Sequence, residues 1–190
     1  MKPTLQKKSK VFYTFFTIMC LLIIGQIVHA QNVEELNQKG NNKANKGDFE
    51  GAIILYSQAI NVNPLYAQGY YNRANAKYDL KQYNAALIDF SKALSLQPHY
   101  KKAFNNRGLT YYQLKEYDAA KKDFDKAISL DPKYSVAYGN RGNVFYHQRN
   151  NTAALKDFDQ AIKLNPENTT DYYYRGVLYF KMGNFAACLK

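Results

Sequence analysis

The sequence predicts an all-α fold made of repeated pairs of antiparallel helices. Its strongest sign is a strict 34-residue period, because four of the five prolines are equally spaced along the chain. Alanines and aromatic residues keep the same step, and no insertion or deletion breaks it between Val33 and Lys190. Within each unit, small and apolar residues also recur at i, i+4 and i+7, which is the spacing of one helical face. Such a period indicates a real internal repeat. The four prolines are Pro64, Pro98, Pro132 and Pro166.

Each unit is expected to contain two helices joined by a short turn, as the third unit illustrates. Its first helix is expected at residues 102–114, where Phe104, Gly108 and Tyr111 share one face. Its second helix is expected at residues 118–130. The two helices should then lie antiparallel, because the turn between them is short.

Residues at the ends of the two expected helices, and at the contact between them, support this assignment of a helix pair. Asp118 would complement the positive end of the second helix dipole. Pro132 would end that helix, because proline lacks an N–H donor and restricts the residue before it. Gly108 and Ala120 are small, so they should let the two helices approach closely.

The pattern resembles the tetratricopeptide repeat (TPR) family over residues 33–190. The residues that carry the resemblance in the third and fourth units are Phe104, Gly108, Tyr111, Ala120, Phe124, Ala127, Pro132, Tyr138, Gly142, Phe145, Ala154, Phe158, Ala161 and Pro166. The resemblance implies a right-handed superhelix of helix pairs, an α-solenoid of about four and a half repeats, with a concave groove. The repeats are expected at residues 33–66, 67–100, 101–134 and 135–168, with a partial fifth at 169–190.

The two terminal units depart from the pattern. The first has a polar first helix, as expected of a capping repeat whose outer face is exposed to water. The fifth reaches Lys190 part-way into its second helix, without the closing alanine and proline of the other units. We therefore expect the full protein to continue beyond this residue.

Residues 1–30 are expected to be a signal peptide. Lysines precede an apolar segment from Val11 to Val28, and Val28 and Ala30 stand three and one residues before a cut at Gln31. The alternative is an uncleaved membrane anchor, because this segment is just long enough to span a bilayer. Either way the remainder is expected to be exported, to the periplasm or exterior of a Gram-negative bacterium.

The composition gives no support for catalysis or for nucleic-acid binding. The net charge is +11, but the basic surplus outside the N-terminal lysines is spread along the chain. Cys20 falls within the expected signal peptide, which leaves Cys188 without a cysteine partner. His99 and His147 are isolated, and no nucleophile has a base at a recognisable spacing. We expect no enzymatic activity, no cofactor, no metal and no nucleic-acid partner.

The resemblance places first-helix side chains along the concave groove. Asn72, Asn106 and Asn140 occupy the same position in three successive repeats. They resemble the asparagines that bond the backbone of an extended peptide in the TPR arm of O-linked N-acetylglucosamine transferase. An amide offers a donor and an acceptor, so it suits a peptide group whatever the side chain. The alternative is that asparagine is simply common at this position of the repeat.

Aromatic residues follow the asparagines at the same step, at Tyr78, Tyr112, Tyr146 and Phe180. The resemblance implies that they face the groove, where rings bind apolar side chains or prolines. The alternative is packing between repeats. Further groove contacts are expected from Asn75, Asn143, Lys102, Gln113 and His147. The lysine–asparagine clamp that some TPRs use for a terminal carboxylate is not reproduced, because no unit has a lysine at its fifth position.

An arginine also recurs in each of the last four units, at Arg73, Arg107, Arg141 and Arg175. The first three are each followed, at a constant spacing, by an aspartate of the second helix, at Asp89, Asp123 and Asp157. A partly buried guanidinium requires a carboxylate partner. We hypothesise pairs within repeats, such as Arg107 with Asp123, and the alternative runs across repeats, such as Asp89 with Arg107. Both assign the arginines a structural role.

The expected function is an exported scaffold or adaptor that binds a protein or an extended peptide in its groove. An alternative is motivated by the incomplete fifth repeat. The chain would then be the extracytoplasmic sensory or regulatory TPR module of a longer signalling protein. A membrane contact is expected only through an uncleaved N-terminal segment.

Overall fold

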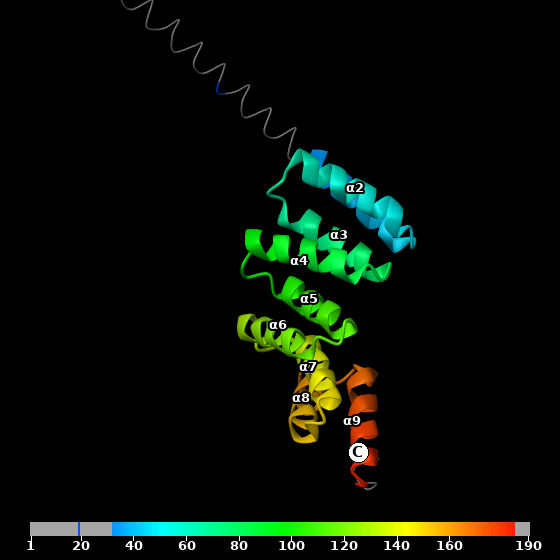
Figure 1. Cartoon of the computed structure of the whole chain (residues 1–190), viewed down its shortest axis with the longest axis vertical. Coiled ribbons are helices and arrows are strands. Elements are labelled where there is room, and N and C mark those ends of the chain that lie inside the picture. The colour runs from blue at the N-terminus through cyan, green and yellow to red at the C-terminus, as the bar shows by residue number, and fades with distance from the viewer. Residues whose placement is uncertain (1–18, 20–31, 185–190) are drawn as a thin grey trace, which may run out of the picture.

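The structure is a computed structural model that describes residue 19 and residues 32–184 of the 190-residue chain. The described residues form helices and turns, with no strand among them (Figure 1). A helix over residues 32–45 comes first. It is followed by α2 (Phe49–Val62), α3 (Ala67–Asp79), α4 (Tyr83–Leu96), α5 (Lys101–Gln113), α6 (Tyr117–Leu130), α7 (Ser135–His147), α8 (Asn151–Leu164) and α9 (Thr169–Lys181). The predicted all-α solenoid of helix pairs is confirmed.

The helix bounds differ from the expected ones by one residue, and local hydrogen bonds explain the shift. Helix α5 ends at Gln113, because Lys115 takes a left-handed conformation with φ of 62° and its N–H bonds to the carbonyl of Tyr112 at 2.9 Å. Helix α6 begins before Asp118, because the carbonyl of Glu116 accepts a hydrogen bond from the N–H of Ala120 at 3.0 Å.

The helices stack in chain order, from α2 at one end of the molecule to α9 at the other (Figure 1). The first helices of neighbouring repeats also touch one another, α3 with α5, α5 with α7 and α7 with α9. Among the described helices, no second helix touches the second helix of a neighbouring repeat. The stack therefore curves toward the first helices, which line its concave side.

Within a repeat, the two helices close over a small residue on the first. A Cβ added at Gly108 would lie 2.8 Å from the Phe124 ring, and a Cβ added at Gly142 would lie equally close to Phe158. Both rings are fully buried. The expected close approach at Gly108 is confirmed, and any larger side chain there would displace the ring that fills the core.

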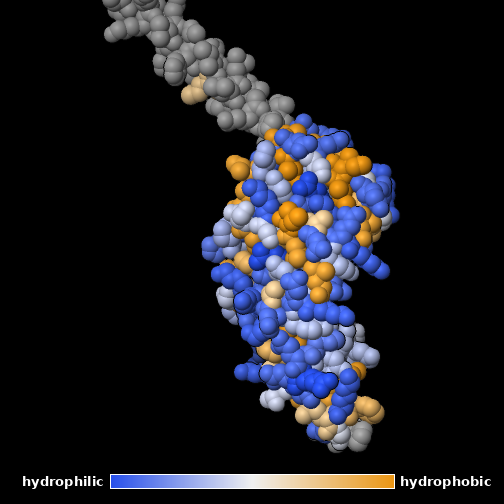
Figure 2. All heavy atoms as spheres, viewed as in Figure 1, coloured by the Kyte–Doolittle hydropathy of each residue, from blue (hydrophilic) through white to orange (hydrophobic). Residues whose placement is uncertain are grey.

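Apolar side chains on the face shown in Figure 2 gather over the N-terminal repeats, and the middle of the stack is mostly hydrophilic. Three large apolar residues of these repeats are exposed: Ile54 by 59%, Leu65 by 73% and Ile88 by 70%. Lysines occupy the positions of Ile54 and Ile88 in the next two repeats, at Lys122 and Lys156. The repeats thus share a core and differ in surface chemistry.

Apart from residue 19, the expected signal peptide lies outside the described residues, as does the second helix of the fifth repeat. Over the part of the chain that is described, no helix combines the length and the apolar character needed to cross a bilayer.

Candidate peptide-binding groove

Asparagine side chains form a ladder of hydrogen bonds along the concave side. Asn72 Nδ2 donates to Asn37 Oδ1 at 2.8 Å and to Asn41 Oδ1 at 3.2 Å. The partners belong to the preceding repeat, 35 and 31 residues earlier in the chain. The amide of Asn72 therefore connects the first helices of two repeats.

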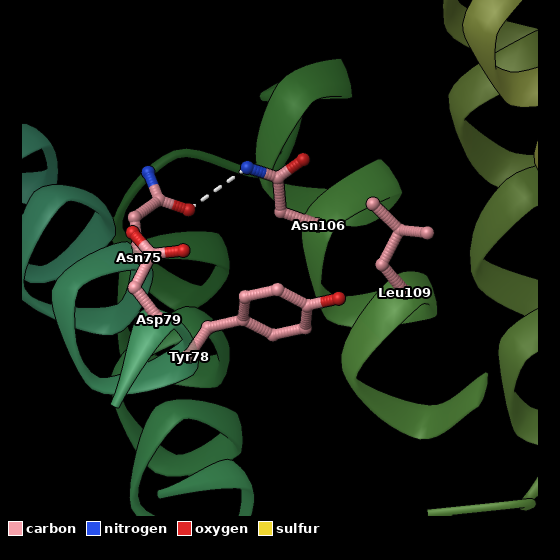
Figure 3. A pocket seen from close by; sticks show the side chains of 5 residues that line it. All are labelled: Asn75, Tyr78, Asp79, Asn106 and Leu109. Atoms are coloured by element: carbon pink, nitrogen blue, oxygen red, sulfur yellow. Dashed lines mark hydrogen bonds between the residues drawn. The ribbon is translucent and has the colours of Figure 1, made fainter. Parts of the chain in front are cut away.

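The ladder continues through the next two repeats. Asn106 Nδ2 donates to Asn75 Oδ1 at 2.8 Å, as Figure 3 shows, and to the Tyr71 hydroxyl at 3.1 Å. Asn140 Nδ2 donates to Asn105 Oδ1 at 2.9 Å. Asn105 is only 2% exposed, so the ladder lies at the base of the groove.

These bonds limit what the three predicted asparagines can offer a ligand. A carboxamide has two N–H donors and two acceptor lone pairs. Asn72 and Asn106 each use both donors on the preceding repeat. Each oxygen accepts one further bond, from Gln68 to Asn72 and from Asn105 to Asn106. Only the side-chain oxygens of Asn72 and Asn106 can therefore accept a further hydrogen bond. Their contact with a peptide stays a prediction.

Asn143 lies where the ladder fails. Its Oδ1 is buried and has no hydrogen-bond partner within the described part of the chain. Asn75, the equivalent residue two repeats earlier, accepts from Asn106, which is 31 residues later. Tyr174 stands at that offset from Asn143, and it brings a ring in place of an amide donor.

The aromatic residues form a second line of contacts between repeats. The Tyr78 hydroxyl accepts a hydrogen bond from Gln113 Nε2 at 3.3 Å. The Tyr112 ring meets His147 edge-on, with ring centroids 5.4 Å apart, and His147 also stacks on Tyr117. Each tyrosine thus touches a residue of the next repeat, and packing between repeats is part of its role.

The aromatic residues of the last two repeats, Tyr146 and Phe180, have different surroundings. The Tyr146 hydroxyl is hydrogen-bonded to Lys181, whose ammonium also lies 4.5 Å from the centre of the Tyr146 ring. Phe180 is 65% exposed. Lys102 lies exposed on the first turn of α5.

Two hollows lie side by side on the concave surface of the N-terminal repeats. The smaller one, of about 260 Å³, is lined by Asn75, Tyr78, Asp79, Asn106 and Leu109 (Figure 3). The larger one, of about 390 Å³, is lined by Gln38, Asn41, Ala44, Asn45, Tyr56, Asn72, Asn75, Ala76 and Asp79. Asn75 and Asp79 belong to both, so the two hollows form one groove across three repeats.

Asp79 was not among the predicted groove residues. Among the described residues that line the two hollows, it is the only charged one. Within the described residues its carboxylate makes no hydrogen bond and no ion pair, and burial raises its pKa above the ordinary aspartate range. The sequence carried a weak signal, because this position varies in charge along the stack: Asn45, Asp79, Gln113, His147 and Lys181.

The recurring arginines lie away from these hollows, and three of them, Arg73, Arg107 and Arg141, bind aspartates within their own repeats. Arg107 donates from Nε and Nη2 to the two carboxylate oxygens of Asp123, at 2.7 and 2.8 Å. The same bidentate geometry joins Arg73 to Asp89 and Arg141 to Asp157. These hydrogen bonds raise the pKa of each of the three guanidinium groups. The arginines are therefore structural in this fold.

The third nitrogen of each arginine reaches across to the preceding repeat, but not to the aspartate considered in the alternative. Its partners stand 16 residues earlier in the chain, at Ser57, Ser91, Asp125 and Asp159. Within its repeat, each partner stands two residues after the position that Asp89, Asp123 and Asp157 occupy. The cross-repeat pairing of Asp89 with Arg107 is thus wrong, because Asp89 is held by Arg73 and Lys77.

Comparison with solved structures finds several TPR proteins with this fold. A TPR protein from Parabacteroides merdae is 28% identical, with a TM-score of 0.72 over 83% of this chain and 62% of that one. The first TPR domain of Spaghetti (RPAP3), bound to an HSP90 peptide, is also 28% identical, with a TM-score of 0.61 over 63% of this chain and 94% of that one. PilF of Pseudomonas aeruginosa is 20% identical, with a TM-score of 0.76 over 84% and 78%.

The protein-family models agree with the structural comparison, although no curated protein matches the sequence. A model described as tetratricopeptide repeat matches residues 67–100 and 102–134. A second, described as TPR repeat, matches residues 40–81 and 142–183. Together these ranges cover more than half of the sequence, in register with the 34-residue period. The chain belongs to the tetratricopeptide repeat family of protein-interaction scaffolds.

Proposed function

We propose that the chain is a scaffold that binds an extended peptide segment of a partner protein in the groove lined by the helix over residues 32–45, α3 and α5. The observation that carries this proposal is the continuous hollow surface of the first helices, lined by amides, tyrosines and one carboxylate. An extended peptide presents a backbone N–H or C=O at every residue, so it requires a surface with polar groups at regular steps. The first helices supply such groups once per repeat.

The similar domain of RPAP3, which is bound to an HSP90 peptide, supports a peptide as the ligand class. The fifth position of each unit argues against capture of a terminal carboxylate, since it holds Asn37, Tyr71, Asn105, Gly139 or Tyr173. A ligand that lacks a free C-terminus fits this groove better. An internal segment of a partner protein, threaded along the first helices, meets that requirement.

Site-specific photo-crosslinking tests the location of binding. A photoreactive residue replaces Gln113, which is exposed and bonds to Tyr78 of the groove, or Ile88, which is exposed on the second helix α4. Partners captured from the native envelope fraction should be crosslinked from position 113 and not from position 88. Equal capture from both positions, or capture from position 88 alone, would contradict binding in the groove.

We also propose that the chain is exported and cleaved after Ala30. The support is the arrangement of the N-terminal sequence, in which lysines, an apolar segment and small residues before Gln31 follow one another. Expression of the full chain in a Gram-negative host should give a periplasmic protein that begins at Gln31. A membrane-bound product that retains Met1 would instead support the anchor.

A further inference from the structure

The groove contains one carboxylate that the fold itself does not use. Most aspartates on these helices are committed to cations, such as Asp89 to Arg73 and Lys77, and Asp48 to Lys43. Asp79 has no such partner within the described residues, and it lies where the two hollows meet. Its position at the end of α3 is also unfavourable, because a helix C-terminus carries partial negative charge.

The described residues that line the two hollows bring no cation to Asp79. Every other residue that lines the two hollows is an asparagine, a glutamine, a tyrosine, an alanine or a leucine. Asp79 is exposed to solvent, yet desolvation of its carboxylate by neighbouring atoms disfavours the charged form and raises its pKa above the ordinary aspartate range. A ligand that brings a cation would remove this penalty, whereas an anionic ligand would increase it.

The groups around Asp79 also favour a ligand rich in hydrogen-bond donors. Asn72 and Asn106 spend both N–H donors on the ladder, so they present acceptor oxygens. A lysine ammonium has three donors and an arginine guanidinium five, and neither has an acceptor. Tyr78 lines the same hollow as Asp79 (Figure 3), and its ring offers an apolar face to the stem of a long basic side chain.

We propose that Asp79, with Tyr78 and the neighbouring asparagines, forms a subsite for a lysine or arginine side chain of the bound peptide. This inference rests on the proposed function, because it assigns one side chain of the same ligand. The subsite anchors the peptide by a charge-assisted hydrogen bond and sets its register in the groove. The partner is then recognised by a basic residue within an extended segment.

Selection from a phage library of random nonapeptides on the full chain tests the subsite. Wild type should enrich peptides with lysine or arginine at one fixed position. Asp79→Asn should lose this preference, and Asp79→Lys should replace it with a preference for aspartate or glutamate. The matched control is Glu50→Gln, which removes an exposed carboxylate on the second helix α2 and should select the same peptides as wild type.

A selected peptide then allows a thermodynamic cycle. Replacing its basic residue by norleucine should weaken binding to wild type by about tenfold or more and should hardly affect binding to Asp79→Asn. Equal weakening with both proteins, or peptides without a basic preference on wild type, would overturn the subsite but leave groove binding intact. Failure of wild type to enrich any peptide would instead count against the proposed function itself. Circular dichroism of both Asp79 variants shows whether each is folded.

Discussion

Arg107 holds Asp123 by two parallel hydrogen bonds of 2.7 and 2.8 Å, and its third nitrogen reaches Ser91 of the preceding repeat at 3.1 Å. One guanidinium therefore ties α5 to α6 within its repeat and to α4 of the repeat before. The side chains of Arg107 and Asp123 are only 20% and 8% exposed. Removing one partner would leave a charge that is largely shielded from water.

Arg107→Leu is expected to destabilise the protein by about 3–5 kcal/mol, because it leaves Asp123 as an uncompensated buried charge. Arg107→Leu combined with Asp123→Leu should recover most of that loss, since replacing both members of a buried pair by apolar residues is often neutral or stabilising. Urea unfolding followed by two probes measures both effects, because repeat arrays can unfold in more than one step.

The control for the charge argument is an exposed pair. Lys39 and Glu35 lie 2.6 Å apart with side chains 58% and 65% exposed, and Lys39→Ala should cost less than about 1 kcal/mol. A double variant as unstable as Arg107→Leu alone would show that the arginine acts through its other contacts rather than by neutralising Asp123.

Asn143→Leu is expected to stabilise the fold by about 1–3 kcal/mol, because it removes a buried oxygen that has no partner within the described residues. Such a group costs its full desolvation penalty. Leu109 occupies the same position one repeat earlier, so the site accepts this shape. The shift of the thermal unfolding midpoint measures the effect.

The matched variant for this prediction is Asn75→Leu, at the same position of an earlier repeat. Asn75 accepts a hydrogen bond from Asn106 at 2.8 Å, so its replacement should destabilise the protein by leaving that donor unmatched. If both substitutions moved the midpoint in the same direction, the hydrogen bonds of the ladder would not explain the difference between them.

Asp171 should make stability depend on pH. The residue is 3% exposed, and burial raises the pKa of its carboxyl group, although a hydrogen bond from Asn168 at 2.7 Å opposes the shift. An acid with a raised folded-state pKa binds protons more tightly in the folded state. Its ionisation therefore lowers stability as the pH rises from its unfolded pKa, about 3.9, through its folded pKa.

Asp171→Asn removes this ionisation and keeps an oxygen to accept from Asn168. We expect the variant to unfold at a higher temperature than wild type at pH 7, with a gap that narrows as the pH falls toward about 4. Thermal melts of both proteins between pH 4 and 8 provide the comparison. A gap that does not change with pH would exclude the buried charge as its cause.

The fold could be predicted from the sequence because the same pattern of residues recurs in each repeat. Gly108 and Phe124 recur one repeat later as Gly142 and Phe158, so successive units reinforce one assignment. The ion pair between Arg107 and Asp123 could be predicted from the same period, since both residues lie within one repeat. Contacts within one repeat can be predicted from the sequence when the two residues keep a constant spacing from repeat to repeat.

Contacts between repeats could not be read in this way. The offset of 35 residues that joins Asn72 to Asn37 arises from the way the first helices stack, which the period alone does not reveal. In the same stacking, asparagine N–H groups that the sequence analysis assigned to a peptide ligand donate hydrogen bonds to the preceding repeat instead. Asp79 was missed for a related reason, because its position carries no constant residue type from repeat to repeat.

The most direct test of the central claim is a crystal structure of the full chain with a peptide selected on it. The peptide should lie extended along the helix over residues 32–45, α3 and α5, over the asparagine ladder. A basic side chain should reach the Asp79 carboxylate. A peptide bound on the second helices α4, α6 and α8, with the hollows at Asp79 unchanged, would contradict the account.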